Sequence, residues 1–357
     1  MAWYYLLAAL AYTIGFIFLG RRIVSWSLTS HISLKCIKST NLTYYHIIHH
    51  SSRLLSHLLT KEHKQYKPTF YNILIMTQSS SKFTIGILGC ANIAKKNCRA
   101  AHKTSDCKVT TISSRSKDKA RGFVTEILDS DQSIKIHSGD DAYNELLQNN
   151  SGQLDSVYIP LPTKLHEQYV AKALSLKYHV LLEKPVAISS TSYKDMLSEA
   201  SKNKKFLMDG TMFVHHPRTK AFTTSINNPN RVSFNFTFDG TKNGQLGSNF
   251  FTNDIRLKKD GDFLGCVGDL GWYCVRMGLL VFSANDANAL KGMVKSAQVV
   301  RYQLNDEGVP YEADCLVYFT DNRVLSFHCS FIHPLCQTVM ISGTGGAGYT
   351  ATMTDAS

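Results

Sequence analysis

The chain has 357 residues, more than a single hydrophobic core usually contains, so two domains are expected. Hydrophobic residues at 44% and charged residues at 18% exclude a disordered chain and indicate a globular protein. The net charge of +12 is uneven, because residues 1–75 hold eight Lys or Arg and only one acid. The +5 that remains elsewhere forms no basic stripe, which excludes nucleic acid as the expected partner.

Residues 1–75 are expected to be an extension, and two interpretations of it stay open. Residues 2–19 form a nearly continuous apolar run that is just long enough to span a bilayer, and Arg21 and Arg22 follow it. The positive-inside rule would then leave the rest of the chain in the cytosol. Alternatively, Met76 begins a polar leader directly before a strand, as a natural start would, and residues 1–75 extend the gene model. A cytoplasmic protein is expected, with membrane contact only if residues 2–19 act as an anchor.

The cysteines and histidines do not predict a metal site. The nine cysteines are scattered without a Cys-x-x-Cys pair, which favours free thiols in a reducing compartment. The histidines at positions 46, 49, 50, 57 and 63 lie close together in sequence, but no partner cysteines or carboxylates accompany them. We therefore expect no bound metal.

Residues 83–94, Phe-Thr-Ile-Gly-Ile-Leu-Gly-Cys-Ala-Asn-Ile-Ala, read as a strand, a small-residue turn and the start of a helix. Gly89, Ala91 and Ala94 take the three small positions of a dinucleotide-binding fingerprint, at which a pyrophosphate would meet the N-terminus of the helix. An ordinary buried strand and turn is the alternative, because only one of the three positions is glycine. The candidate cofactor-binding residues of this turn are Gly89, Ala91, Asn92 and Ile93.

The next strand, from residue 107, ends in Ser114-Arg115-Ser116-Lys117. NAD-binding sheets commonly carry an acid here for the ribose hydroxyls, and this chain has none. The guanidinium of Arg115 suits an adenosine 2′-phosphate, with Ser114 and Lys117 beside it, so NADP(H) is favoured over NAD(H). The alternative is a solvated basic turn that opens the next helix.

Strands and helices alternate through the rest of the first domain, which is assigned to residues 76–203. This alternation predicts a parallel, doubly wound sheet whose ligands bind beyond the carboxyl ends of the strands. Pro160 and Pro162 follow one such strand, and Glu183 and Lys184 follow another. The expected helices are 118–128, 141–148 and 167–176, the last opened by His166, and the expected strands are 134–137, 154–159 and 179–182.

The second domain is assigned to residues 204–357, after a helix at 189–203. Residues 240–261 are rich in Gly, Asn and Lys and read as a long loop. A helix is expected to open at Gly268 and continue through residue 280, with Asp269 and Tyr273 one turn apart on the same face. An Asp N-cap with a packed aromatic residue is the alternative interpretation. The expected strands are 232–238, 296–304, 313–319 and 324–331.

Four motifs occur in the order and spacing of a known family: Ile-Gly-Ile-Leu-Gly-Cys-Ala-Asn-Ile-Ala, Ser-Arg-Ser, Tyr-Ile-Pro-Leu-Pro-Thr-x-x-His and Leu-Leu-Glu-Lys-Pro-Val-Ala. The chain resembles the Gfo/Idh/MocA oxidoreductases over about residues 83–343, near a plant branch related to dihydrodiol dehydrogenases. The resemblance implies an N-terminal Rossmann domain, a C-terminal domain with a large, open, mostly antiparallel sheet, and hydride transfer on a small sugar, polyol or dihydrodiol.

The resemblance also implies roles for individual residues. Lys184 matches the catalytic lysine, His166 a histidine that lines the nicotinamide and the substrate, and Asp269 and Tyr273 a pair beside the reactive carbon. A lysine of normal pKa is too basic for a proton acceptor, but burial and a nearby nicotinamide cation would both favour its neutral form. The cofactor-binding residues implied at the strand ends are Pro160, Pro162, Glu183 and Lys184.

The end of the chain departs from the family pattern. Residues 343–348 satisfy Gly-x-Gly-x-x-Gly, but only nine residues follow them, so we expect a hairpin between late strands and not a nucleotide site. Relatives continue for further strands that complete the sheet and often supply the face of a homodimer. A shortened second domain would expose a sheet edge. A nucleotide-binding or regulatory protein without turnover, or an inactive truncated product, is therefore the alternative function.

Overall fold

The computed structural model describes residues 82–129, 131–223, 227–241, 246, 248–283, 290, 292–343 and 350–353, the last four by their backbone. The apolar run at residues 2–19, like the rest of the predicted extension, lies outside the described residues. Among the described residues, the structure contains no helix with the length and apolar character needed to cross a bilayer.

The first domain is built on a six-stranded parallel sheet with the order β3-β2-β1-β4-β5-β6. The predicted doubly wound parallel sheet is confirmed. The sheet continues six residues beyond the predicted boundary at residue 203, because β6 belongs to it. In chain order the elements are β1 (Phe83–Leu88), α4 (Asn92–Lys103), β2 (Cys107–Ser114), α5 (Lys117–Ile127), β3 (Lys135–Ser138), α6 (Ala142–Asn149), β4 (Ser156–Ile159), a 3₁₀ turn (Thr163–Leu165), α7 (His166–Ser175), β5 (His179–Leu182), α8 (Ser190–Lys202) and β6 (Leu207–Asp209).

The helices of this domain cover the sheet because their apolar residues recur with the helical period. In α5, Ala120, Phe123, Val124 and Ile127 are buried, at the i, i+3, i+4 and i+7 positions of one face. The strands of the sheet are apolar along their length, and all four residues of β4 are buried. A strand that is buried on both faces is typical of a parallel sheet with helices on either side.

The second domain carries a mixed six-stranded sheet with the order β12-β11-β7-β10-β9-β8. All its neighbouring strands are antiparallel except β7 and β10, which confirms the expected open, mostly antiparallel sheet. Its elements are two short helical segments (Met212–His215 and α9, Pro217–Thr223), β7 (Pro229–Thr237), α10 (Asn249–Asn253), a 3₁₀ turn (Ile255–Leu257), a π-helical turn (Val267–Gly271), α11 (Trp272–Phe282), β8 (Val294–Leu304), β9 (Pro310–Phe319), β10 (Val324–Ser330), β11 (Cys336–Gly343) and β12 (Thr350–Met353).

The sequence predicts a long loop at residues 240–261, but the structure shows that this segment is not a continuous loop. The segment contains α10 and the 3₁₀ turn that follows it. Two aromatic side chains hold this segment against the core, since Phe250 packs edge-on to Phe331 and Phe251 edge-on to Tyr311. A helix of five residues has too few turns to show an apolar period, so tertiary packing and not local sequence stabilises it.

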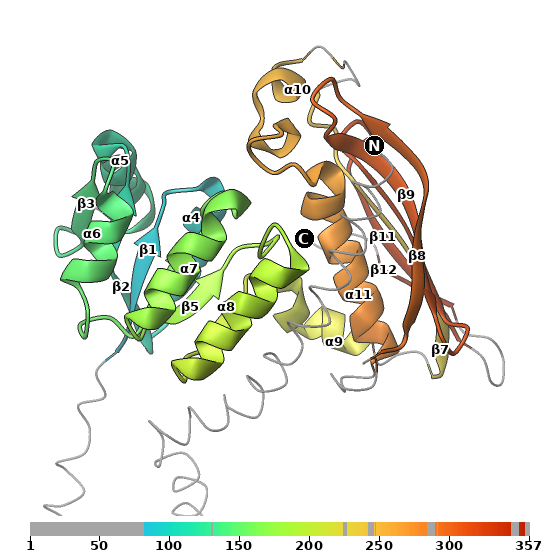
Figure 1. Cartoon of the computed structure of the whole chain (residues 1–357), viewed down its shortest axis with the longest axis horizontal. Coiled ribbons are helices and arrows are strands. Elements are labelled where there is room, and N and C mark those ends of the chain that lie inside the picture. The colour runs from blue at the N-terminus through green and yellow to red at the C-terminus, as the bar shows by residue number, and fades with distance from the viewer. Residues whose placement is uncertain are drawn as a thin grey trace, which may run out of the picture.

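Helix α11 lies between the second sheet and the first domain (Figure 1). Its side chains are buried on nearly every face, as expected for a helix with protein on both sides. Gly278 allows a close approach to the sheet, because a Cβ atom there would lie 2.8 Å from the Leu325 side chain. The helix therefore separates the two domains, and the residues at its N-terminus face the end of the parallel sheet.

The expected late hairpin is consistent with the antiparallel pairing of β11 and β12, in which Val339 lies opposite Met353. The glycine-rich connection at residues 344–349 lies outside the described residues.

Candidate active site

The first predicted motif forms a tight turn at the end of β1. Gly89 has a φ of +104°, a conformation that glycine adopts without strain, and its N–H donates to the carbonyl of Ser113 at 2.9 Å. A Cβ atom at this position would lie 2.9 Å from the side chain of Leu161, on the turn after β4. The turn lies where β1 is flanked by β2 and β4, the point at which the strand order reverses and ligands bind in such sheets.

Helix α4 begins directly after this turn. Ala91 is its N-cap residue and provides no side-chain hydrogen bond to the first turn. The first N–H groups of a helix have no partner within the helix, so those of Asn92 and Ile93 remain available to an anion. Ala94 is fully buried, which lets α4 pack closely on the sheet.

The end of β2 presents the basic residues that were predicted to select NADP(H). Ser114 is buried, whereas Arg115 and Lys117 are exposed. Ser116 caps α5, because its hydroxyl accepts a hydrogen bond from the N–H of Lys119 at 3.2 Å. The segment is thus a helix-opening turn, as the alternative interpretation held. Within the described residues, Arg115 makes neither a hydrogen bond nor an ion pair, so its guanidinium is available to a ligand.

The turn after β4 contacts the buried ring of His166. Pro160 is buried and Pro162 half-buried. His166 is wholly buried, with Nε2 2.7 Å from the carbonyl oxygen of Leu161 and Nδ1 3.1 Å from that of Val186. The resemblance implied a histidine that lines the nicotinamide and the substrate. The structure instead places this ring inside the protein, where it joins the turn after β4 to the turn after β5.

Lys184 follows β5 directly and precedes Pro185 through a cis peptide bond. Its ammonium group forms an ion pair with Oδ1 of Asp269, and its Nζ also lies 3.3 Å from the carbonyl oxygen of Asp269. The two side chains are 13% and 17% exposed, so the pair is nearly buried but open on one side. These residues are 85 positions apart in sequence, and the pair joins the first domain to the second.

Asp269 occupies the π-helical turn, and the helical backbone continues into α11. It is therefore not an N-cap residue, which was the alternative interpretation of the sequence. Wide turns of this kind occur frequently at functional sites. Tyr273 lies one turn later, with its ring centroid 5.1 Å from Nζ of Lys184 and its hydroxyl donating to the sulfur of Met212 at 3.8 Å. Asp269 and Tyr273 thus both face Lys184.

Arg256, in the segment that was expected to be a loop, completes the charged group. Its Nη1 lies 3.7 Å from Oδ2 of Asp269, and its Nε lies 3.1 Å from Oδ1 of Asp254. The guanidinium also lies over the rings of Phe238 and Phe250, at 5.5 and 5.7 Å from their centroids. Sequence reasoning missed Arg256, because no motif surrounds it and only the folding of this segment brings it to Asp269.

The ion pair reverses the expected behaviour of Lys184. Burial alone lowers the pKa of Lys184, as the sequence analysis expected, but the adjacent Asp269 carboxylate raises that pKa above its ordinary value overall. Burial acts to raise the pKa of Asp269, yet Lys184 and then Arg256 hold it below its usual range. The protein alone therefore favours a protonated Lys184, and the predicted neutral form would need the additional effect of the nicotinamide cation.

Glu183 supports the same turn from the interior. It is buried, and burial raises the pKa of its carboxyl group. The hydroxyl of Tyr158 donates to its Oε1 at 2.5 Å, and the amide of Asn97 on α4 donates to that hydroxyl oxygen at 2.7 Å. Its Oε2 accepts the backbone N–H of Lys184 at 3.3 Å. This network links α4, β4 and the turn after β5, and it positions Lys184 through its backbone.

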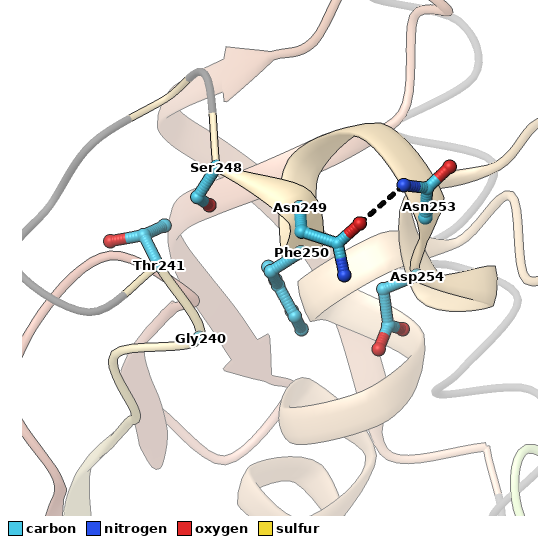
Figure 2. A pocket seen from close by; sticks show the side chains of 7 residues that line it. All are labelled: Gly240, Thr241, Ser248, Asn249, Phe250, Asn253 and Asp254. Carbon is cyan, nitrogen blue, oxygen red and sulfur yellow. Dashed lines mark hydrogen bonds between the residues drawn. The ribbon is translucent and has the colours of Figure 1, made fainter.

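A cavity of about 430 Å³ lies beside α10, next to the charged residues Arg256 and Asp269. Figure 2 shows amide, hydroxyl and carboxylate side chains gathered around the ring of Phe250. Asp254 belongs both to this lining and to the ion pair with Arg256, so the cavity wall is connected to Asp269 through two charged contacts. The lining residues are Gly240, Thr241, Ser248, Asn249, Phe250, Asn253 and Asp254.

Comparisons with known proteins agree with this architecture. A dTDP-3,4-didehydro-2,6-dideoxy-alpha-D-glucose 3-reductase from Streptomyces violaceoruber is 28% identical over 58% of this chain and 57% of its own. The D-xylose 1-dehydrogenase (NADP(+)) 2 of Haloferax volcanii is 30% identical over 56% of this chain and 58% of its own. The chain thus spans about half the length of the curated relatives it matches.

Solved structures share the fold at low sequence identity. KijD10, a 3-ketoreductase from Actinomadura kijaniata in complex with NADP, gives a TM-score of 0.57 at 22% identity and covers 77% of this chain and 76% of its own. GenD2 from gentamicin A biosynthesis, in complex with NAD, gives 0.61 at 18% identity, with 76% and 72% covered. Residues 83–211 match the family model described as "Oxidoreductase family, NAD-binding Rossmann fold". Residues 83–211 of this chain are therefore similar to the Gfo/Idh/MocA oxidoreductases, the family that the sequence motifs resemble.

Proposed function

We propose that the chain is an NADP-dependent oxidoreductase that transfers a hydride between the nicotinamide and a carbon–oxygen centre of a small sugar, polyol or dihydrodiol. The observation that carries the proposal is the ion pair of Lys184 with Asp269, which stands at the carboxyl end of β5 and joins both domains. The relatives named as sugar reductases and dehydrogenases support the substrate class. The second domain would supply the substrate side of the site.

The residues at the strand ends fit the cofactor. The N–H groups that open α4 suit a pyrophosphate. The turn before them requires glycine, because a Cβ atom at Gly89 would meet the side chain of Leu161. The guanidinium of Arg115 is exposed and has no partner among the described residues, so with Lys117 beside it this arginine suits a 2′-phosphate. When bound, NADP(H) supplies or accepts the hydride. The proposed cofactor-binding residues are Gly89, Ala91, Asn92, Ile93, Ser114, Arg115, Lys117, Pro160, Pro162, Glu183 and Lys184.

Lys184 is the proposed proton donor when a carbonyl group is reduced. As the hydride reaches the carbon, negative charge develops on the oxygen, and a protonated lysine beside it can both stabilise that charge and deliver a proton. Asp269 raises the pKa of Lys184, so the lysine carries the proton that the reduction of a carbonyl group requires. In oxidation, Lys184 would have to accept the proton of the alcohol and must first become neutral. Tyr273 is a further proposed catalytic residue, because its ring adjoins Nζ of Lys184.

His166 is a positioning residue in this proposal. Its ring joins the turn that contains Leu161 to the turn that contains Val186, and Lys184 lies two residues before the second of these contacts. The ring is buried, and burial lowers its pKa, while the contacts with the carbonyl groups of Leu161 and Val186 act in the opposite direction. It would fix the Lys184 turn relative to the turn after β4.

We expect Arg115→Ala to weaken NADPH binding by about 10- to 100-fold, the loss associated with one or two hydrogen bonds to a charged group. NADH binding should be unchanged, because NADH lacks the 2′-phosphate. Fluorescence titration of the full-length chain with each cofactor measures both affinities. Arg121→Ala, an exposed arginine on α5, is the matched control and should change neither. Equal loss of NADPH and NADH binding in Arg115→Ala would contradict the assignment of this residue to the 2′-phosphate.

We expect Asp269→Asn to change the pH dependence of carbonyl reduction. In the wild type the pKa of Lys184 is raised, so the rate should be flat through neutral pH and fall only in alkaline solution. Without the carboxylate, the remaining effect of burial lowers that pKa, and the falling limb should move to lower pH by about 1–3 units. Steady-state rates across the pH range test this. The control Asp260→Asn removes a fully exposed acid and should leave the pH–rate profile unchanged. If the alkaline fall in rate does not move in Asp269→Asn, then Asp269 does not set the pKa of the proton donor.

A further inference from the structure

Strand pairing in the second sheet gathers two histidines and two carboxylates on one face. Asp314 on β9 lies opposite His328 on β10 in the antiparallel register. Successive residues of a strand face opposite sides, and Ala313 and Cys315 are buried in the core. Glu312 and Asp314 therefore lie on the other face of the sheet, away from the side that α11 covers (Figure 1).

Three of these side chains have the arrangement of a metal-binding set, which we call the Glu–His cluster: Glu312, His328 and His333. One potential ligand atom of each lies within 4.8 Å of the other two. Oε1 of Glu312 is 3.2 Å from Nε2 of His333. Bonds of about 2.0–2.1 Å to a tetrahedral Zn²⁺ place ligand atoms about 3.3 Å apart. The separation of Glu312 and His333 already matches this value, and the ligand atom of His328 lies within 4.8 Å of both.

Outer contacts already orient these ligands. Asp314 Oδ1 lies 2.8 Å from Nδ1 of His328, an arrangement that fixes the ring and leaves the other nitrogen for a metal. The amide of Gln303 donates to Oε2 of Glu312 at 3.0 Å, and the hydroxyl of Tyr311 donates to the Gln303 oxygen at 2.6 Å. The second carboxylate oxygen of Glu312 is thereby held, and Oε1 is directed toward His333. Carboxylate–histidine–metal contacts of this kind are typical outer partners of zinc ligands.

The charge at the cluster also favours a cation. The Glu312 side chain is only 2% exposed, and Asp314 adds a second negative charge beside it. Nη1 of Arg301 lies 3.0 Å from Glu312 and 3.5 Å from Asp314, so one guanidinium faces two carboxylates. With neutral histidines the group is left with a net charge of −1. The Arg301 side chain is 54% exposed, so it can turn toward solvent when a divalent cation approaches.

We propose that Glu312, His328 and His333 bind Zn²⁺, with one coordination position left to water. Two imidazoles and one carboxylate form a ligand set suited to Zn²⁺, whereas Mg²⁺ and Ca²⁺ prefer sites made of oxygen alone. The cluster lies across the sheet from α11 and so is separate from Lys184 and the proposed cofactor residues. The metal would tie the start of β9 to β10 and to the segment that follows β10.

The test is a Zn²⁺ titration of the full-length chain against a chromophoric chelator, which counts bound equivalents and measures their affinity. The double variant His328→Ala/His333→Ala should bind one equivalent fewer than the wild type. Histidines at residues 46–63 contribute the same background to both proteins. His102→Ala, which removes a half-exposed histidine of the first domain, is the matched control and should bind as the wild type does. Added Zn²⁺ should raise the Tm of the wild type and not that of the double variant.

Two single variants that keep all three proposed ligands should change the Zn²⁺ affinity in opposite directions. Asp314→Asn should weaken Zn²⁺ binding by about 10- to 100-fold, because it removes the outer partner of His328. Arg301→Gln should strengthen binding, because it removes the cation that competes for Glu312. Equal Zn²⁺ binding by the wild type and the double variant would overturn the proposal, as would weaker binding in Arg301→Gln. NADPH titration of the same proteins reports on the first domain separately, so either proposal can fail alone.

Discussion

Replacing Lys184 with Met is expected to lower kcat for carbonyl reduction by about 10²–10⁴-fold, the usual contribution of a positioned proton donor. Methionine is close to lysine in length but carries no proton to deliver and no charge to stabilise the developing oxyanion. Stopped-flow measurement of NADPH oxidation would give the rate of the chemical step. The loss should appear in kcat with a smaller change in KM, because the interaction strengthens as the carbonyl oxygen becomes negative.

Two measurements separate this loss from misfolding. Lys184→Met should retain NADPH binding within a few-fold, because Lys184 is one of several proposed cofactor contacts and the residues proposed to hold the phosphates lie on other turns. Lys202→Ala, an exposed lysine at the end of α8, is the matched control and should keep wild-type kcat. The result that would exclude Lys184 as the proton donor is a Lys184→Met protein that binds NADPH and loses less than about tenfold in kcat. Such a loss is smaller than the usual contribution of a positioned proton donor.

Replacing Asp209 with Leu is expected to lower the free energy of unfolding by about 3–5 kcal/mol, the cost of breaking a buried ion pair from one side. Asp209, at the end of β6, accepts a hydrogen bond from Nη2 of Arg276 on α11 at 3.0 Å, and the two side chains are 5% and 3% exposed. The variant leaves the guanidinium buried without its counterion. Because the pair connects the first sheet to the helix between the domains, urea unfolding should also show reduced cooperativity.

The double variant Asp209→Leu/Arg276→Met should recover most of the lost stability, since it removes both charges and fills the same space with apolar side chains. In the wild type, Nε of Arg276 has no hydrogen-bond partner within the described part of the chain, so this pair is not fully compensated even when intact. Asp260→Ala breaks an exposed pair with Lys164 and should scarcely change the urea midpoint. A double variant less stable than Asp209→Leu would contradict this account, because it would show that Arg276 stabilises the protein without Asp209.

The sequence was sufficient for the first domain because each of its signals is local. A buried parallel strand is a short apolar run, and a helix such as α5 shows its period within eleven residues. The turn at Gly89 was also identifiable, because a positive φ and a close neighbour at Leu161 both require a small residue. In the second domain only the strand that became β7 was predicted from its alternation, and the open, mostly antiparallel sheet was implied by the family resemblance.

The charged group could not be derived from the sequence, because its members meet only in the folded protein. The motif order and the family resemblance drew attention to Lys184 and Asp269, but not to their contact or to the pKa that the contact raises. Arg256 has no local signal, and it reaches Asp269 only because Phe250 and Phe251 anchor α10. The burial of His166 could not be read from the sequence either, because it depends on the turns that pack around the ring.

The most direct test of the proposed function is hydride transfer itself. The full-length chain would be incubated with NADPH deuterated at the transferring position and a panel of keto sugars, keto derivatives of inositol and small diketones. Mass spectrometry would then follow the label. We predict deuterium on the carbinol carbon of at least one product with the wild type, and none with Lys184→Met. A chain that binds NADPH while the label stays on the nicotinamide with every compound would contradict an oxidoreductase and support the alternative of a nucleotide-binding protein without turnover.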